Sequence, residues 1–354
     1  AQTEIQWWHA LTGANNDVVV KLAEDFNASQ KDYKIVPAYK GSYPDTLNAG
    51  IAAFRAGTAP HILQVFEVGT GTMMSAKGAV KPVHEMMKEA GEAFDPKAYL
   101  PAITGYYSTA KGEMLSMPFN SSSMVMWYNK DAFKKAGLNP DAPPKTWPEV
   151  FEAGKKLKAA GFEKCGFTNA WAPWANIEQF GAWHNIPLST KVNGMDGFDA
   201  VLNFNQSPLF LKHWTNLAEL QKAGVYDYSG RTNTGEGRFT SGECPIMLTS
   251  SGFFGNVKAN AKFDWANAAM PYYPEAAGAP QNSIIGGASL ELNNPEPTDN
   301  SKGLRYGSLV QIRDIWSEEM EAALNGQKTP KAALDAAVER GNQMLRQFER
   351  SASR

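Results

Sequence analysis

Five short loops in the sequence are rich in hydroxyl side chains and glycine, and each follows a stretch that we expect to be a strand. They are KGSYPD (40–45), VFEVGTG (65–71), PFNSSS (118–123), LTSSGFFG (248–255) and IIGGAS (284–289). Serine hydroxyls, backbone N–H groups beside glycine and helix N-termini together form a neutral cradle that suits an anion. A single Ser/Gly loop usually only turns the chain. Five at equivalent places favour a ligand site at one sheet edge, without identifying the ligand.

The spacings that catalytic and metal sites require are missing from the sequence. The five histidines form no HxxxH pair, which argues against a metalloprotease-type zinc site. The sequence has neither a GxSxG elbow nor a GxxxxGK[ST] phosphate loop, and EVGTGTMM (67–74) lacks the third glycine of a dinucleotide fingerprint. Glu318 and Glu319 follow a helical, surface-like pattern rather than that of a glycosidase pair. We therefore predict a protein that is not an enzyme and uses no cofactor.

Length, composition and charge are those of an ordinary globular protein. The 354 residues suffice for two or three domains, and 43% of them are hydrophobic and 20% charged. A formal net charge of −2 gives no reason to expect nucleic acid or an acidic membrane as partner. The start, AQTEIQWWHA, carries no basic and apolar leader. Its Ala1 would fit a cleaved signal peptide, and would equally fit a cytosolic protein.

The two cysteines, Cys165 and Cys244, leave two possibilities open. In an oxidising compartment they would form one disulfide that closes a long loop. The alternative is a pair of buried free thiols. Their number and the absence of CxxC spacing argue against structural zinc.

Strands and helices alternate in the first part of the chain, and this order must position the first loops. Apolar residues at helical spacing predict helices over 15–30 and 43–57. Strands are predicted over 33–41 and 61–70, the first confined to a sheet edge or an interruption by Pro37. This β-α-β-α-β order predicts an α/β lobe with a mostly parallel sheet and helices on both faces.

A second α/β lobe begins near SMVMWYNKDAFKKAG (123–137), which is typical of a strand followed by a short helix. Thr146 and Glu149 have capping-box spacing, with Pro148 in the first helical turn. At the end of the chain, Pro330 is expected to start an amphipathic helix that packs on a lobe.

The run VMWYNKDAFKKAGLNPDAPPKTWPEV (125–150) resembles the extracellular solute-binding proteins of ABC importers, in the maltose-binding-like group. The similarity extends over nearly the whole chain and is greatest to members that bind glycerol phosphates. It implies two hinged α/β lobes, each a mostly parallel sheet flanked by helices, with the ligand between them. The N-terminal lobe would comprise residues 1–118 and about 266–292. The C-terminal lobe would comprise 119–265 and about 303–354.

The same resemblance implies a role for individual residues in ligand binding. The expected contacts are Tyr43 and Glu67 in the N-terminal lobe, the hydroxyls of Ser122 and Ser250, the backbone of Gly287, Arg313 at the phosphate, and an aromatic wall of Trp147, Trp171 and Trp174. Arginine offers a bidentate fork to phosphate oxygens, which lysine does not. Glu67 would repel a phosphate, so its expected partner is a glycerol hydroxyl. A tryptophan face covers a polyol and accepts a choline cation equally well.

Each of these residues also has a purely structural alternative. Ser122 and Ser250 could be turn residues, Gly287 a packing glycine, and Tyr43 an exposed residue at a helix start. Trp147 could be a hydrophobic staple, and Trp171 and Trp174 could lie in the core. Arg313 could pair with Asp314 or Glu318 on its own helix.

The sequence departs from the family after IIGGASL (284–290). Family members continue with N-terminal-lobe helices and a GYLP loop whose Tyr contacts ligand, whereas ELNNPEPTDNSKGLRYG follows here at once. We therefore expect a junction between Leu290 and Glu291 of pieces that are not neighbours in the family. Omission of residues is favoured over a deletion or a split chain. A true deletion would expose apolar surface on the N-terminal lobe and destabilise or oligomerise the protein.

The resemblance predicts a periplasmic, monomeric substrate-binding protein of an ABC importer. It would capture sn-glycerol-3-phosphate or a glycerophosphodiester such as glycerophosphocholine by hinge closure, and deliver it to the transmembrane subunits. One alternative is a sugar or oligosaccharide binder of the same fold, favoured if the tryptophans dominate affinity. A secreted phosphodiester hydrolase is the second alternative, disfavoured by the missing histidine and carboxylate constellations.

Overall fold

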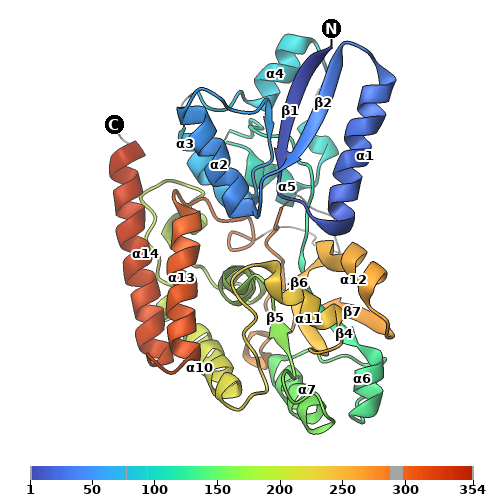
Figure 1. Cartoon of the computed structure of the whole chain (residues 1–354). Coiled ribbons are helices and arrows are strands. Elements are labelled where there is room, and N and C mark those ends of the chain that lie inside the picture. The colour runs from blue at the N-terminus through green and yellow to red at the C-terminus, as the bar shows by residue number, and fades with distance from the viewer. Residues whose placement is uncertain (1, 77, 94, 110, 288–297, 353–354) are drawn as a thin grey trace.

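The computed structural model describes residues 2–76, 78–93, 95–109, 111–287 and 298–352. Two lobes, each built around its own sheet, lie one above the other in Figure 1. The predicted junction between Leu290 and Glu291 lies outside the described residues. Within the described ranges, no helix combines the length and apolar composition needed to cross a bilayer.

The first lobe contains a three-stranded parallel sheet, as the sequence predicted. β1 is central, and β2 pairs with it along its full length, with Pro37 opposite Trp7. Pro37 therefore sits in an edge strand, where its missing N–H costs no ladder bond to a further strand. The elements are β1 (Thr3–His9), α1 (Gly13–Ser29), β2 (Tyr33–Tyr39), α2 (Tyr43–Arg55), β3 (Ile62–Leu63), α3 (Thr70–Ser75), α4 (Val83–Ala90) and α5 (Pro101–Tyr107).

The second lobe has a four-stranded sheet in the order β5-β6-β4-β7. β5 and β6 are parallel, but β4 runs antiparallel to both β6 and β7, so this sheet is mixed rather than mostly parallel. Its strands are β4 (Met124–Asn129), β5 (Thr168–Asn169), β6 (Ile246–Ser250) and β7 (Trp265–Ala269). Its helices are α6 (Lys130–Lys135), α7 (Trp147–Ala159), α8 (Phe180–Trp183), α9 (Thr190–Gly194), α10 (Pro208–Lys222), α11 (Glu236–Thr240), α12 (Phe254–Asn260), α13 (Leu309–Leu324) and α14 (Pro330–Ala352), with a π-helix, η3 (Trp174–Gln179).

β7 changes one predicted boundary. The sequence assigned residues from about 266 to the first lobe, yet β7 pairs with β4 in the second sheet. The chain passes toward the first lobe only later, where Ile285 packs with Ile103, Tyr106 and Tyr107. An antiparallel edge strand leaves no βαβ signature in the sequence, which is why the boundary was placed too early.

Helices α2 and α7 are both capped at their N-termini. α2 starts with a capping box between Ser42 and Asp45, and α7 with one between Thr146 and Glu149. At the other end of the chain, α13 and α14 pack side by side against the second lobe (Figure 1). α13 also touches the 3₁₀ turn Glu67–Gly69, so it links the lobes directly.

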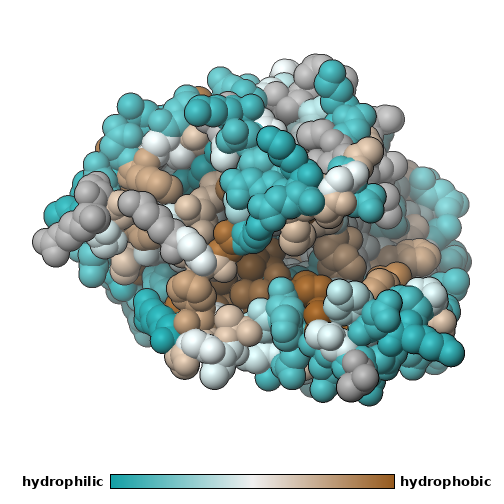
Figure 2. All heavy atoms as spheres, turned by 90° about the horizontal axis from the view of Figure 1, so that it is seen from above, coloured by the Kyte–Doolittle hydropathy of each residue, from teal (hydrophilic) through white to brown (hydrophobic). Residues whose placement is uncertain are grey.

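The core lies mainly in the second lobe. Its largest buried side chains include Trp214, Trp316 and Tyr273. The first lobe is covered less well, since α1 buries only Val19 and Ala23. Large apolar side chains that are more than 40% exposed there include Phe26, Phe54, Ile62 and Met86. From above, hydrophobic residues are visible in a hollow between hydrophilic ones (Figure 2).

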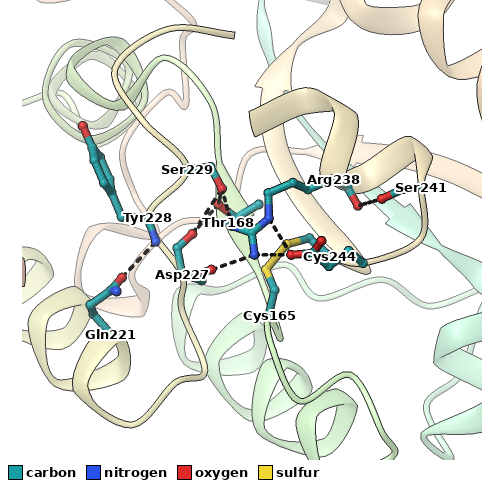
Figure 3. The surroundings of a disulfide bond; sticks show 10 residues. Cys165, Thr168, Gln221, Asp227, Tyr228, Ser229, Arg238, Ser241 and Cys244 are labelled. Carbon is teal, nitrogen blue, oxygen red and sulfur yellow. Dashed lines mark hydrogen bonds and ion pairs between the residues drawn. A yellow bond between two sulfur atoms is a disulfide. The ribbon is translucent and has the colours of Figure 1, made fainter. Parts of the chain in front are cut away.

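Cys165 and Cys244 form a disulfide, which settles the question that the sequence left open. The bond joins the segment after α7 to the residues just before β6, across 79 positions of the chain (Figure 3). Beside it, Arg238 forms ion pairs with Asp227 and Glu243. The disulfide and these ion pairs together connect parts of the second lobe that are far apart in the sequence.

Candidate ligand-binding cleft

A cavity of about 390 Å³ lies between the lobes, lined by residues of both. Its size falls within the usual range for small-molecule sites. The structure brings eight of the nine predicted site residues to its walls: Tyr43, Glu67, Ser122, Trp171, Trp174, Ser250, Gly287 and Arg313. The sequence loops that carry them are far apart along the chain, and the two-lobed fold makes them converge.

The lobes touch each other at one side of the cavity. The start of α1 packs against α12, and the Asn15 side chain donates a hydrogen bond of 3.4 Å to the carbonyl of Gly252. A Cβ on Gly255 would lie 3.1 Å from the Cβ of Ala14, so the backbones approach closely. The cleft is therefore closed on this side by contacts between α1 and α12.

Arg313 is held by two carboxylates, one from each lobe. Its Nε and Nη2 both donate to Glu178 of η3, the latter over 2.7 Å, and Nη2 also lies 3.1 Å from Glu67 Oε1. Burial raises the pKa of Glu178 while the Arg313 charge opposes that shift. Burial would by itself lower the pKa of Arg313, but the Glu178 charge raises it, so the guanidinium stays protonated.

This arrangement changes the expected role of Arg313. Two carboxylates already occupy its fork, and together the three groups carry a formal charge of −1. Arg313 lines the cavity, yet the structure does not present it as a free cation for a phosphate. Its pairing with Asp314 or Glu318, considered from the sequence, is not the arrangement found.

The crossing segment 282–287 brings two glycines against the cavity wall. Gln179 of η3 holds this segment by accepting a hydrogen bond from the Ile284 amide (3.2 Å). Ser122 then pairs with Gly286 through both backbone groups and donates its hydroxyl to the Gly286 carbonyl. The Gly287 amide donates to Glu67 Oε2 over 3.0 Å. Gly287 therefore orients Glu67, and its N–H is already engaged within the protein.

Gly286 makes the closer approach of the two. A Cβ at Gly286 would meet the Trp174 ring at 2.6 Å, whereas one at Gly287 would meet Tyr43 Oη at 3.1 Å. The indole of Trp174 thus lies directly against the Gly286 backbone. A side chain at position 286 would displace that ring from the cavity wall.

Aromatic rings form one side of the cavity. Tyr43 and Phe66 stack with centroids 5.3 Å apart and an interplanar angle of 2°, and Trp171 lies 6.2 Å from Tyr43. Trp171 has a φ of 54°, a left-handed conformation that costs energy for a residue other than glycine. Hydrogen bonds from its own amide to Thr232 and from Ala175 to its carbonyl hold it there.

Several residues that line the cavity carry uncharged donor atoms with hydrogen-bonding capacity to spare. The Trp174 Nε1 and Ser121 Oγ atoms are buried and have no partner within the described residues. Ser250 Oγ accepts from the Gly252 amide, and Tyr43 Oη accepts from Asn120, so both hydroxyl hydrogens remain available. Burial raises the pKa of Tyr43 to about 12, which keeps its hydroxyl protonated. The wall thus offers a set of neutral donors to an acceptor such as a phosphate oxygen.

Trp147 is the predicted site residue that the structure does not bring to the cavity. It is 2% exposed and packs in the core, with its ring 4.6 Å from His213 and 6.3 Å from Tyr273. As the first residue of α7, it points into the second lobe, which corrects its assignment to the aromatic wall.

The cavity and cluster residues that were missed from the sequence include Ser121, Glu178 and Glu236. Glu178 could have been noticed as a carboxylate inside the apolar run 171–183, which is otherwise suited to burial. It lies on a π-helix, a feature that is frequent at functional sites. For Ser121 and Glu236 we find no distinguishing sequence signal.

Among the described residues, no group of three or more histidine, cysteine or carboxylate side chains is arranged to hold a metal ion. The charged groups around the cavity are accounted for by the Arg313 cluster and Glu236. Their geometry suits recognition of a small molecule.

The chain was compared with known proteins. Residues 13–298 match the family model of bacterial extracellular solute-binding proteins. The sn-glycerol-3-phosphate-binding periplasmic protein of Brucella abortus (strain 2308) is 45% identical, covering 97% of this chain and 93% of that protein. The protein of the same name from Escherichia coli (strain K12) is 44% identical, covering 99% and 94%. The alignment with the Brucella protein extends over 406 positions, at least 52 more than the 354 residues here, so that relative carries residues without a counterpart in this chain.

A solved structure shares the fold. UgpB from Mycobacterium tuberculosis, in complex with glycerophosphocholine, superposes with a TM-score of 0.77 at 16% identity, covering 99% of this chain and all of that one. This superposition shows that the two chains share a fold. The chain belongs to the family of bacterial extracellular solute-binding proteins.

Proposed function

We propose that this protein captures sn-glycerol-3-phosphate or a glycerophosphodiester in the cleft and delivers it to the transmembrane subunits of an ABC importer. The names of the relatives that are 44–45% identical support this ligand class. The single structural observation that carries the proposal is the convergence of unpaired neutral donors and an aromatic wall in one cavity between the lobes.

The donors suit the phosphate and the aromatic rings suit the glycerol carbons. Trp174 Nε1 and Ser121 Oγ each lack a partner, and a buried donor gains most when a ligand oxygen reaches it. Neutral donors bind a desolvated anion without the large cost of burying further charge. The stacked Tyr43 and Phe66 rings offer a flat apolar surface to the CH edges of glycerol.

In this proposal the lobes close around the ligand, and the ligand is not chemically changed. Arg313 and Glu178 of the second lobe meet Glu67 of the first, and α1 meets α12. A ligand that touches both lobes stabilises this closed arrangement, which the importer can distinguish from the open one. We infer a periplasmic monomer that is not an enzyme, in keeping with the names of its relatives and with the Cys165–Cys244 disulfide.

One observation favours a second candidate. Arg313 already donates to two carboxylates, so a neutral sugar or oligosaccharide would meet the same aromatic wall with no charge mismatch. A thermal-shift panel of glycerol-3-phosphate, glycerophosphocholine, inorganic phosphate and maltose separates the two. We expect the melting temperature to rise with one or both glycerol phosphates and not with maltose. A rise with maltose alone would overturn the proposal in favour of the sugar.

A further inference from the structure

Two buried histidines, His184 and His213, both contact Tyr273 in the core of the second lobe. They are 4% and 0% exposed. The Tyr273 amide lies 3.0 Å from His184 Nε2, and the Tyr273 hydroxyl oxygen lies 3.3 Å from His213 Nδ1. The other hydrogen bonds of each histidine determine which group donates in these two contacts.

A backbone carbonyl fixes the position of the hydrogen on His184. Its Nδ1 lies 2.8 Å from the carbonyl oxygen of Phe180, which can only accept a hydrogen bond, so Nδ1 carries the hydrogen. In the neutral ring Nε2 then has no hydrogen, and it accepts from the Tyr273 amide. A second proton on His184 would place one N–H group directly against another.

A chain of side-chain amides fixes the position of the hydrogen on His213. Asn169 Nδ2 donates to the carbonyl of Ala170, so Asn169 Oδ1 accepts from the Asn176 amide nitrogen 3.2 Å away. The Asn176 oxygen therefore faces His213 Nε2 at 3.2 Å, and Nε2 must carry the hydrogen. His213 Nδ1 is left as the acceptor for the Tyr273 hydroxyl. A second proton on His213 would remove that acceptor.

Tyr273 thus donates both its amide and its hydroxyl, one to each histidine. The Asn216 amide donates to the same hydroxyl oxygen over 2.9 Å, which leaves the hydroxyl hydrogen for His213. Both contacts require neutral imidazole rings. Burial lowers the pKa of His184 to about 4 and lowers the pKa of His213 well below its ordinary value, so both rings are neutral at pH 7.

The side chain of Asn176 connects this network to the wall of the cleft. Asn176 lies within η3, a π-helix, which is a rare type of helix. Three other residues of η3 line the cavity, hold Arg313 or hold the segment that crosses between the lobes: Trp174, Glu178 and Gln179. His184 caps the short helix α8 that follows η3 directly. One wall of the cleft therefore depends on hydrogen bonds that only neutral histidines can make.

We propose that His184 and His213 form an acid-sensitive device: as neutral rings they hold η3 in place, and their protonation releases this helix and loosens the cleft wall. Both are positioning residues, since neither lines the cavity. The protons come from solvent, and each binds a ring nitrogen when its contact with Tyr273 opens. The device goes beyond ligand capture, because it makes the shape of the cleft depend on acidity.

The direction of the pH effect follows from the lowered pKa values. In an opened state the rings regain a pKa of about 6.5, so this state binds more protons than the intact one between about pH 6.5 and pH 4. The intact arrangement is therefore most stable above about pH 6.5 and loses stability as the pH falls. Each histidine that gains a proton on opening raises the opening equilibrium by roughly twentyfold between pH 7 and pH 5.

The charged groups around the two rings have other partners or are exposed. Glu275 faces His184 but forms an ion pair with Lys212, and it opposes the effect of burial on the pKa of His184 only in part. The remaining groups on the neighbouring elements are Glu219 (exposed), Glu149 (bound to the amides of Lys145 and Thr146), Glu178 (with Arg313), Glu319 (with Lys328 and Arg340), Glu321 (with Arg231) and Asp335 (with Lys331).

Glu178 is the one group of this set that serves the cleft and also has a raised pKa. Its protonation in acid would change the cleft independently of the histidines. The test therefore compares variants of His213 at the same pH.

Hydrogen exchange at pH 7 and pH 5, corrected for the intrinsic rate at each pH, tests the inference without any ligand. Peptides from 174–184 report on η3 and α8, and peptides from β1 report on the first lobe. His213→Gln keeps a donor for Asn176 but cannot gain a proton. His61→Gln, at an exposed histidine of the first lobe, is the matched control.

We expect the protection of 174–184 in the unmodified protein to fall by more than a hundredfold from pH 7 to pH 5. The fall should be roughly twentyfold smaller in His213→Gln and unchanged in His61→Gln. Peptides of β1 should keep their protection. An equal fall in both lobes, or the same fall in His213→Gln as in the unmodified protein, would overturn the inference.

Nitrogen NMR of the unmodified protein with labelled histidine keeps the inference testable if His213→Gln does not fold. At pH 7 we expect hydrogen on Nδ1 of His184 and on Nε2 of His213, with both rings neutral. The opposite tautomer or a charged ring at either position would overturn the inference.

Calorimetry with glycerol-3-phosphate at the same two pH values tests the connection to the cleft. We expect the affinity to fall at least tenfold more in the unmodified protein than in His213→Gln. An equal fall would show that acid acts through the cleft carboxylates alone, and would overturn the inference. Absence of binding by this ligand and by glycerophosphocholine at pH 7 would overturn the proposed function and leave the hydrogen-exchange test valid.

Discussion

Arg313 of α13 donates through both Nε and Nη2 to Glu178 of the π-helix, with Nη2 2.7 Å from Glu178 Oε2. Both residues belong to the second lobe, and the same guanidinium reaches Glu67 of the first lobe over 3.1 Å. Arg313 therefore ties the two lobes together where they meet at the cavity. Arg313 therefore contributes to binding at least partly by holding these two carboxylates in place.

Replacing Arg313 with alanine should remove ligand binding and also destabilise the protein. Glu67 and Glu178 would be left as buried carboxylates without a cation, at a cost of about 3–5 kcal/mol in the free energy of unfolding. Denaturant unfolding and calorimetry measure the two effects. The double variant Arg313→Gln with Glu178→Gln should regain much of the stability. Lost affinity with unchanged stability would show that Arg313 serves the ligand directly and not the cluster.

Gly286→Ala should harm binding more than Gly287→Ala. A Cβ at position 286 meets the Trp174 ring at 2.6 Å, whereas at position 287 the nearest atom is 3.1 Å away, on the Tyr43 hydroxyl. Displacing Trp174 removes a donor and part of the aromatic wall, so we expect at least a tenfold loss of affinity at 286. Titration of both variants by intrinsic fluorescence gives the comparison. A larger loss at 287 would mean that the glycine next to Glu67 is the one in contact with ligand.

Trp174→Phe should weaken ligand binding by about tenfold while leaving the fold intact. The change keeps a ring against Gly286 and removes the unpaired Nε1 hydrogen. Trp147→Phe is the matched control, because Trp147 also has an unpaired Nε1 but lies in the core. It should lower stability and leave affinity unchanged. Equal affinity losses in both variants would contradict a specific role for the Trp174 N–H.

Reduction of the Cys165–Cys244 disulfide should lower stability and spare affinity. The bond closes a loop across 79 positions of the chain, for which chain entropy predicts about 4 kcal/mol. The cysteines lie away from the cavity walls. Chemical unfolding of the oxidised protein and of a double Cys→Ser variant measures the difference, with calorimetry of the folded variant as the companion experiment. A change in affinity larger than about threefold would indicate that the bond positions the cleft.

The exposed apolar residues of the first lobe should bind a hydrophobic dye in the native state. Phe26 and Phe54 are 41% and 45% exposed and do not line the cavity. Phe26→Lys with Phe54→Lys should reduce dye fluorescence without changing ligand affinity. Val201→Lys, at a 44% exposed position of the second lobe, should change it little. An unaltered signal in the double variant would place the dye elsewhere.

Local sequence signals predicted the elements that depend on local chemistry. The parallel first sheet, the edge position of Pro37 and the capping box of α7 follow from short-range patterns, and the structure has all of them. The antiparallel pairing of β7 with β4 joins segments more than 130 residues apart, and short-range patterns carry no information about it. The mixed second sheet was missed for the same reason.

The same distinction between local patterns and long-range contacts applies to the candidate site. Loops at strand ends converge as a doubly wound fold requires, which is why most of the predicted residues line the cavity. Trp147 and the engagement of Arg313 could not be foreseen, because both depend on which distant side chains lie opposite them. Glu178 and His213 are those partners. Residue type alone does not distinguish a cavity wall from a core.

Isothermal titration calorimetry of the purified chain with glycerol-3-phosphate and glycerophosphocholine tests the central claim most directly. The cavity is lined by both lobes and by residues with unpaired donors. We therefore predict one binding site per chain, with a dissociation constant of roughly micromolar or tighter. The absence of heat with either ligand, in a protein shown to be folded, would contradict the account.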